Sequence, residues 1–207
     1  MASFQAIETI SDVVVRLLQA SHDPDDFGGQ RLGFAVYQGE DFRSAGGNTL
    51  TTGVSLFLYR VVVNGSVRTP PGRRLPSGER QRTQLPLDLH YLITIWAQSA
   101  TTQHQIAGWV MRTLESAPII PEGVLHGSRP QVFEPDETVE IVLNDLTNED
   151  LFRIWDILGA SYHLSIPYLV RNVRIEARET VAEGAPVEER IFDLLDTDGE
   201  ENGAPNG

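Results

Sequence analysis

The sequence has no cysteine and no lysine, so all sixteen of its basic residues are arginine. Without cysteine the chain has no disulfide, thiol nucleophile or cysteine-ligated zinc, and without lysine it has no Schiff-base or lysine-base chemistry. No apolar run approaches the roughly 20 residues of a membrane span. Residues 1–19 also lack the unbroken apolar stretch of a secretory signal, because Glu8, Asp12 and Arg16 interrupt them. We therefore expect neither insertion into a membrane nor export by the general secretory pathway.

Charge is unevenly distributed along the chain, whose formal net charge is -13 at pH 7. This acidity argues against nucleic acid as a partner, because contact with phosphates is electrostatic first. Residues 60–82 carry six arginines against Glu79 alone, whereas ten acids from Glu176 onward are accompanied only by Arg178 and Arg190. The sequence therefore predicts one basic loop and one acidic tail.

Three stretches have apolar residues at helical spacing, with capping residues before them or helix-stopping residues after them. In the third stretch, Thr147 and Asp150 resemble a capping box, and Gly159 is placed to end the helix. The predicted helices are residues 4–18 after the candidate N-cap Ser3, a helix from Thr101 that Pro118 and Pro121 stop, and residues 148–158. Their apolar stripes are, in this order, Phe4, Ile7, Ile10, Val14, Leu17 and Leu18; Ile106, Trp109, Val110 and Leu114; and Leu151, Ile154, Trp155 and Leu158.

Five stretches read as strands, and two of them are apolar enough to have both faces mostly covered. These two, residues 52–64 and 85–98, should lie centrally in a sheet and pair with each other. The order of elements predicts an α+β domain in which a mainly antiparallel sheet packs helices on one face. The domain should span residues 1–178, with a long loop at 64–84 and an acidic tail at 179–207. The remaining predicted strands are residues 31–37, 138–143 and 167–178.

Asp88 and His90 are two residues apart in the second central strand, so both side chains should point to the same face. A catalytic triad would also require a serine, and the sequence does not single one out. We interpret the pair as scaffold, with His90 as a hydrogen-bonded histidine at a sheet or subunit contact. A small hydrolase that uses His90 and Asp88 is the alternative.

The sequence offers no pattern typical of a metal or cofactor site. Its five histidines are scattered without HExxH spacing, and neither GxGxxG nor a P-loop is present. Residues 23–26 and 196–201 resemble the start of calcium loops, but neither continues with the full loop spacing. We therefore expect no metal and no cofactor.

The basic loop can be interpreted in two main ways. It is either a solvated connection between two strands or a docking arm for an acidic surface, because guanidinium groups bind carboxylates through two hydrogen bonds. Nucleic-acid contact is a weaker third reading, since residues 61–84 contain no aromatic side chain that could stack on bases. The candidate partner-binding residues are Arg68, Arg73, Arg74, Arg80 and Arg82.

The acidic tail contains a cluster of large apolar residues within residues 188–196. A cluster of this kind is unusual in a solvated tail, so we expect it to dock. It could fold back onto its own domain or insert into a neighbouring molecule as a short helix or strand, and we favour the neighbour. The candidate docking residues are Ile191, Phe192, Leu194 and Leu195.

Taken together, the segments resemble the cap, or tail-terminator, proteins of contractile injection systems, the phage-tail-like particles of the antifeeding-prophage type. The strand pair, the helix stopped by prolines, and the tryptophan helix followed by Ser-x-Pro-Tyr occur in the order typical of that family. The resemblance runs from the first helix to about Arg178 and leaves out the acidic tail. The segments that carry it are residues 53–64, 85–97, 104–121 and 146–176.

The resemblance implies a structural protein rather than an enzyme. Proteins of this family form a six-fold ring of identical subunits on the last layer of the inner tube and sheath, where they stop polymerisation. The basic loop would then reach an adjacent subunit or the tube, and the tail would bind the sheath or a neighbouring cap subunit. Assembly would take place in the cytoplasm, before any release of the particle from the cell. A monomeric peptide-binding module remains a further alternative.

Overall fold

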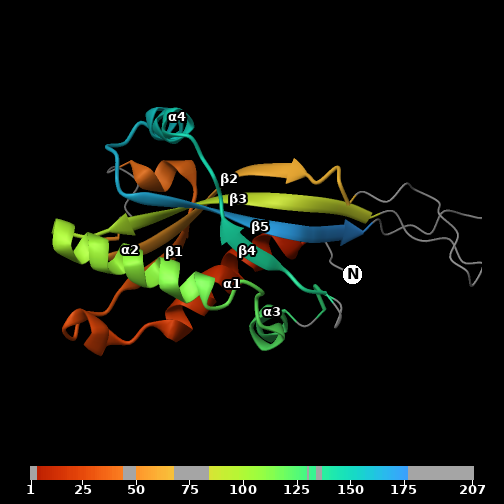
Figure 1. Cartoon of the computed structure of the whole chain (residues 1–207), viewed down its shortest axis with the longest axis horizontal. Helices are drawn as coiled ribbons and strands as arrows, with labels where there is room; N and C mark the ends of the chain where they lie inside the picture. The colour runs from red at the N-terminus through yellow and green to blue at the C-terminus, as the bar shows by residue number, and fades with distance from the viewer. Residues whose placement is uncertain (1–3, 44–49, 68–83, 130, 134–136, 177–207) are drawn as a thin grey trace, which may run out of the picture.

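The computed structural model describes residues 4–43, 50–67, 84–129, 131–133 and 137–176. Within these residues a single five-stranded sheet has the strand order β1-β2-β3-β5-β4 (Figure 1). β1 runs parallel to β2, and the other three neighbouring pairs are antiparallel. The strands are β1 (Gly33–Tyr37), β2 (Gly53–Val63), β3 (Gln84–Trp96), β4 (Glu140–Leu143) and β5 (Ser165–Glu176).

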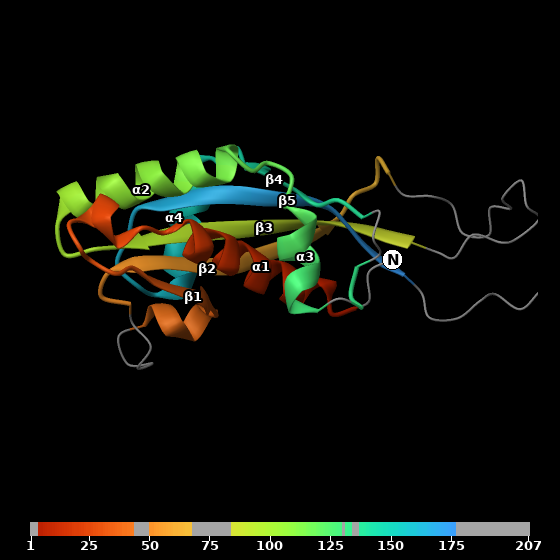
Figure 2. The ribbon, with the colours of Figure 1, turned by 90° about the horizontal axis from the view of Figure 1, so that it is seen from below.

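The helices lie on both faces of this sheet. Figures 1 and 2 show α1 (Ala6–Ser21), α2 (Ala100–Glu115) and α3 (Glu122–Ser128) on one face, which we call the α1 face. The opposite face, the α4 face, carries α4 (Asn148–Leu158) and the short 3-10 helix η2 (Gly39–Phe42). The α+β class and the mainly antiparallel sheet are confirmed. The expectation that helices pack on one face is corrected for α4.

The position of α4 follows from β3, because this strand carries apolar side chains on both of its faces. Tyr91, Ile93 and Ile95 are fully buried in the large core beneath α1 and α2. The alternating residues Leu92 and Trp96 point to the other side. There they form a second core, which also contains side chains of α4 and η2, so both faces of the strand are covered.

The second core is mostly aromatic. Ring centroids lie 5.7 Å apart for Tyr37 and Trp96, and 5.5 Å apart for Phe42 and Trp155. Edge-to-face and tilted arrangements of this kind add to the free energy gained by burying the rings. Trp155 and Leu158 are the buried residues of α4, and both were on its predicted apolar stripe.

Local signals in the sequence place two of the helices well. α4 begins where predicted, because the Thr147 hydroxyl accepts a hydrogen bond from the backbone N–H of Asp150 at 3.1 Å and donates one to its carboxylate at 2.7 Å. It ends at Gly159, which has a φ of 63°. In α2 the N-cap is Ser99 rather than Thr101. Its buried side chains are those of the predicted stripe, Ile106, Trp109, Val110 and Leu114.

Other boundaries differ from the prediction. α1 begins after Gln5, so Phe4 precedes the helix and is exposed instead of forming part of its buried stripe. The predicted cap Ser3, the loop residues 68–83 and the tail 179–207 lie outside the described residues. β2 and β3 pair as predicted, but only the first four residues of β2 are buried. The short helix α3 was not predicted, because seven residues are too few to show a helical period.

Candidate assembly surfaces

Asp88 and His90 lie on the α4 face of β3, and their neighbours are amide groups. The two Asp88 carboxylate oxygens accept hydrogen bonds from Asn64 Nδ2 at 3.3 and 3.1 Å, and one of them also accepts from the backbone N–H of Asn172 at 3.4 Å. His90 Nδ1 lies 3.3 Å from Nδ2 of Asn144. The two side chains therefore hydrogen-bond to different partners, as the scaffold interpretation expects.

Irregularities in both neighbouring strands explain this arrangement. The pairing of β2 with β3 shifts register between Leu58 and Arg60, and the pairing of β5 with β3 shifts opposite Asp88. In the second bulge Asn172 adopts a positive φ of 65°, a conformation that asparagine tolerates better than most residues. In such a bulge the backbone N–H of Asn172 has no carbonyl partner on the neighbouring strand. The Asp88 carboxylate accepts its hydrogen bond instead.

The electrostatics of His90 also favour the scaffold interpretation. Partial burial lowers the pKa of His90 below its ordinary value, the charge of Arg60 lowers it further, and Asp88 raises it only in part. The imidazole is therefore neutral at pH 7. Its contact with the Asn144 amide orients the ring without supplying the negative charge that a triad carboxylate would supply.

Beyond the two bulges the sheet continues as a three-stranded projection, which we call the arm. It consists of residues 60–63 of β2, 84–88 of β3 and 173–176 of β5, and β3 and β5 extend past the layer of helices in Figure 1. β1 pairs with β2 only as far as Phe57, and β4 pairs with β5 only as far as Arg171. Among the described residues, both outer edges of the arm thus lack a strand partner.

The two faces of the arm differ in chemistry. The register places four apolar side chains on the α1 face, and we call them the apolar strip. Exposed Arg60 and Arg174 lie on the α4 face, opposite His90 and Pro86 of β3. The apolar strip consists of Val61, Val63, Leu85 and Ile175.

A second exposed apolar surface lies on α4 and the segment that follows it. We call Phe152, Ile157 and Tyr162 the α4 patch; all three side chains are exposed. The rings of Phe152 and Tyr162 are 5.9 Å apart, and Tyr162 also contacts the buried ring of Trp155 at 5.8 Å. Ile157 additionally lines a surface groove with Phe57 of β2. Exposed apolar side chains that contact one another, such as Phe152 and Tyr162, are typical of protein–protein contacts.

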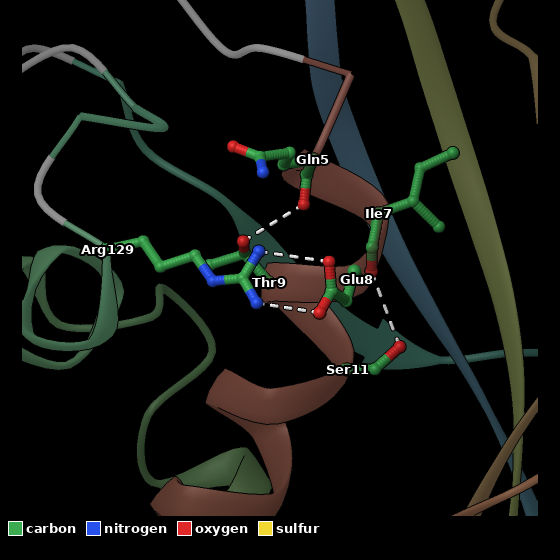
Figure 3. A network of polar contacts seen from close by, with 6 residues as sticks. All are labelled: Gln5, Ile7, Glu8, Thr9, Ser11 and Arg129. Atoms are coloured by element: carbon green, nitrogen blue, oxygen red, sulfur yellow. Dashed lines mark hydrogen bonds and ion pairs between the residues drawn. The ribbon is translucent and has the colours of Figure 1, made fainter.

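Polar contacts fix α1 against the sheet and against the end of α3. Figure 3 shows Arg129 donating two hydrogen bonds to the Glu8 carboxylate, at 2.9 and 2.7 Å. The guanidinium holds the pKa of Glu8 below its usual value, through these bonds and through its charge. Deeper in the molecule the hydroxyl of Ser11 lies 2.9 Å from that of Tyr91, whose pKa is raised by burial. These contacts fix the helix that covers the base of the arm.

The sequence of this chain matches the profile of the Pvc16 N-terminal domain family over residues 9–189. The chain belongs to this family. The resemblance to terminator proteins of contractile injection systems is thereby confirmed. No curated protein is significantly similar to the chain.

Two solved structures share the fold of this family member. One is the PVC sheath/tube terminator of an extracellular contractile injection system in its extended state, with a TM-score of 0.55 and 18% identity over 91% of this chain and 65% of that chain. The other is the cap of the anti-feeding prophage, a tube terminating cap, with a TM-score of 0.50 and 19% identity over 89% of this chain and 60% of that chain. This chain spans less than two thirds of the length of either structure.

The predicted partner-binding residues belong to the two charged segments. Arg68, Arg73, Arg74, Arg80 and Arg82 lie outside the described residues, as do Ile191, Phe192, Leu194 and Leu195.

Within the described ranges no group of acidic and histidine side chains could hold a metal ion. None of the helices there combines the length and apolar character needed to cross a bilayer.

Sequence reasoning missed the apolar strip and the α4 patch, and the sequence contained a local signal only for the α4 patch. Phe152 and Ile157 lie off the buried stripe of α4, and large apolar residues outside such a stripe indicate a second contact surface. We expected residues 52–64 to be mostly covered on both faces. The register shift near Leu58, which ends that coverage, depends on the partner strand and has no local signal.

Proposed function

We propose that this protein caps the end of the inner tube and sheath of a contractile injection particle, where it stops their polymerisation. The observation that carries the proposal is the match to the Pvc16 N-terminal domain family over residues 9–189. The similarity of fold to a sheath/tube terminator and to a tube terminating cap supports it. Such a role is structural, with no catalytic step, and its partners are the tube protein, the sheath protein and further copies of this chain.

A homohexameric ring is the assembly that suits this role. In a cyclic ring each subunit must present two different and complementary surfaces, because every contact is head to tail. The outer strand edges of the arm and the α4 patch are two candidate surfaces of this kind, and they lie in different parts of the molecule (Figure 1). The basic residues Arg68, Arg73, Arg74, Arg80 and Arg82 belong to the connection between two strands of the arm. They are therefore candidates for contact with an adjacent subunit or the tube.

The site of assembly follows from the same role. We propose that the ring closes the particle in the cytoplasm, and that the chain leaves the cell only as part of the released particle. One of the two similar structures comes from an extracellular contractile injection system, which fits such release.

Cells that make the particle but lack this chain should produce tubes and sheaths of widely varying length. Without a terminator the tube keeps adding subunits, and an uncapped sheath loses the contact that holds its last layer. The length distribution is measured on negatively stained particles, and expression of the intact chain from a plasmid should restore a single narrow peak. Particles of normal, uniform length in the absence of the chain would contradict the proposed function.

A further inference from the structure

The apolar strip continues the sheet surface of the large core beneath α1 and α2. None of the described helices covers the strip. Val61 and Val63 are each 43% exposed and Leu85 is 36% exposed. Val61 pairs with Leu89, and Val63 pairs with Leu87, so both valines point to the α1 face with these buried leucines. The strip therefore extends a buried apolar surface into an exposed position.

The strip is uncovered because the helix layer ends before the sheet does. α1 begins at Ala6, and in Figure 2 β3 extends past the helices on this face. Leu87 and Leu89, nearer to α1, are 4% and 0% exposed, whereas Leu85 two residues further out is 36% exposed. An apolar sheet face of this kind needs a covering element, usually a helix.

The chain has a segment that could reach this position. β5 ends at Glu176, and Ile175 of the same strand pairs with Leu85 of the strip. Residues 177–187 then connect β5 to the acidic and apolar segment 188–196, and an extended chain of that length reaches roughly 36 Å. Adjacent strands are about 4.8 Å apart, so β2 lies roughly 10 Å from β5 across the arm. Linkage to the same chain also gives the segment a high effective concentration.

The sequence of the segment fits a helix that lies on an apolar surface. Ile191, Leu194 and Leu195 are at positions i, i+3 and i+4, so a helix would place all three on one face. Glu189 and Asp193 would then lie on the opposite, solvated side.

We propose that residues 188–196 dock as a short amphipathic helix on the apolar strip of their own chain, with Ile191, Leu194 and Leu195 against Val61, Val63 and Leu85, rather than on a neighbouring molecule, which the sequence alone favoured. Docking in this way extends the helix layer of the α1 face out to the arm. It concerns the isolated chain and does not rest on the proposed capping role.

Disulfide trapping tests this docking directly, because the natural chain has no cysteine. The full-length variant V63C/L194C is compared with V36C/L194C under mild oxidation at low protein concentration. Val36 is a matched control, since it is also a valine, is also 43% exposed, and lies in β1 rather than in the arm. Circular dichroism of the reduced proteins checks that both variants keep the fold.

We expect V63C/L194C to form an intramolecular disulfide at least about tenfold faster than the control, because the segment spends most of its time on the strip. The product should remain a monomer on a non-reducing gel and migrate faster than the reduced chain. Equal rates for the two variants would overturn the proposal. Disulfide-linked dimers formed in preference to monomers would also overturn it, since the segment would then dock on a second copy.

Discussion

Replacing Gly53 with alanine is expected to lower the free energy of unfolding by at least about 3 kcal/mol. Gly53 has a φ of 149°, a conformation that residues with a side chain rarely adopt. An added Cβ would lie 2.0 Å from the carbonyl oxygen of Gly33 and 2.7 Å from its backbone nitrogen. Both atoms belong to the backbone of β1, which pairs with β2 at this position, so the clash cannot be relieved by rotating a side chain.

Urea denaturation followed by circular dichroism measures this loss, and two other glycines provide controls. In G33A the added Cβ would meet Cδ2 of the flexible Leu50 side chain at 2.6 Å, so we expect a loss below about 1.5 kcal/mol. Gly108 is an exposed position inside α2 with open space around it, and G108A should raise stability by about 0.5–1 kcal/mol. A G53A variant within 1 kcal/mol of the natural protein would contradict the close approach of β1 and β2.

Replacing Trp155 with alanine is expected to cost about 3–5 kcal/mol, the usual range for removing a buried aromatic side chain. Trp155 is 3% exposed and lies at the centre of the core on the α4 face. Its ring contacts that of Phe42 at 5.5 Å and that of His163 at 5.8 Å. Without it, α4 keeps Leu158 as its only fully buried side chain, so α4 should detach from the sheet before the main core opens.

Phe152 in the same helix is the matched control for this prediction. It is also aromatic but is 54% exposed, so F152A should cost less than about 1 kcal/mol. Amide hydrogen exchange should show that W155A loses protection in α4 while α1 and α2, which pack on the opposite face, stay protected. Equal losses of stability in W155A and F152A, or loss of protection in all helices at once, would contradict the division into two cores.

Much of the secondary structure could be predicted because its signals are local. Thr147 and Gly159 mark the ends of α4 in the sequence, and the stripe of α2 from Ile106 to Leu114 is buried as its spacing indicates. The pairing of residues 52–64 with 85–98 also followed from their composition. The face of the sheet on which α4 lies did not follow from the sequence. It depends on the side chains that β3 presents on the α4 face.

The candidate surfaces were less predictable, because contacts distant in the sequence form them. That Asp88 and His90 share a face follows from strand periodicity, but their partners Asn64, Asn144 and Asn172 come from three other parts of the chain. The register shifts that form the base of the arm arise between strands and leave no local pattern. The involvement of the basic loop and of the acidic tail in binding stays a prediction.

The position of this chain in the particle tests the capping role most directly. The chain is tagged at its N-terminus in its host, purified gently with its partners, and imaged by negative-stain electron microscopy with a label on the tag. The proposed function predicts label confined to one end of sheathed rods. Label along the whole length of the rods, or only small free particles without tube and sheath proteins, would contradict it.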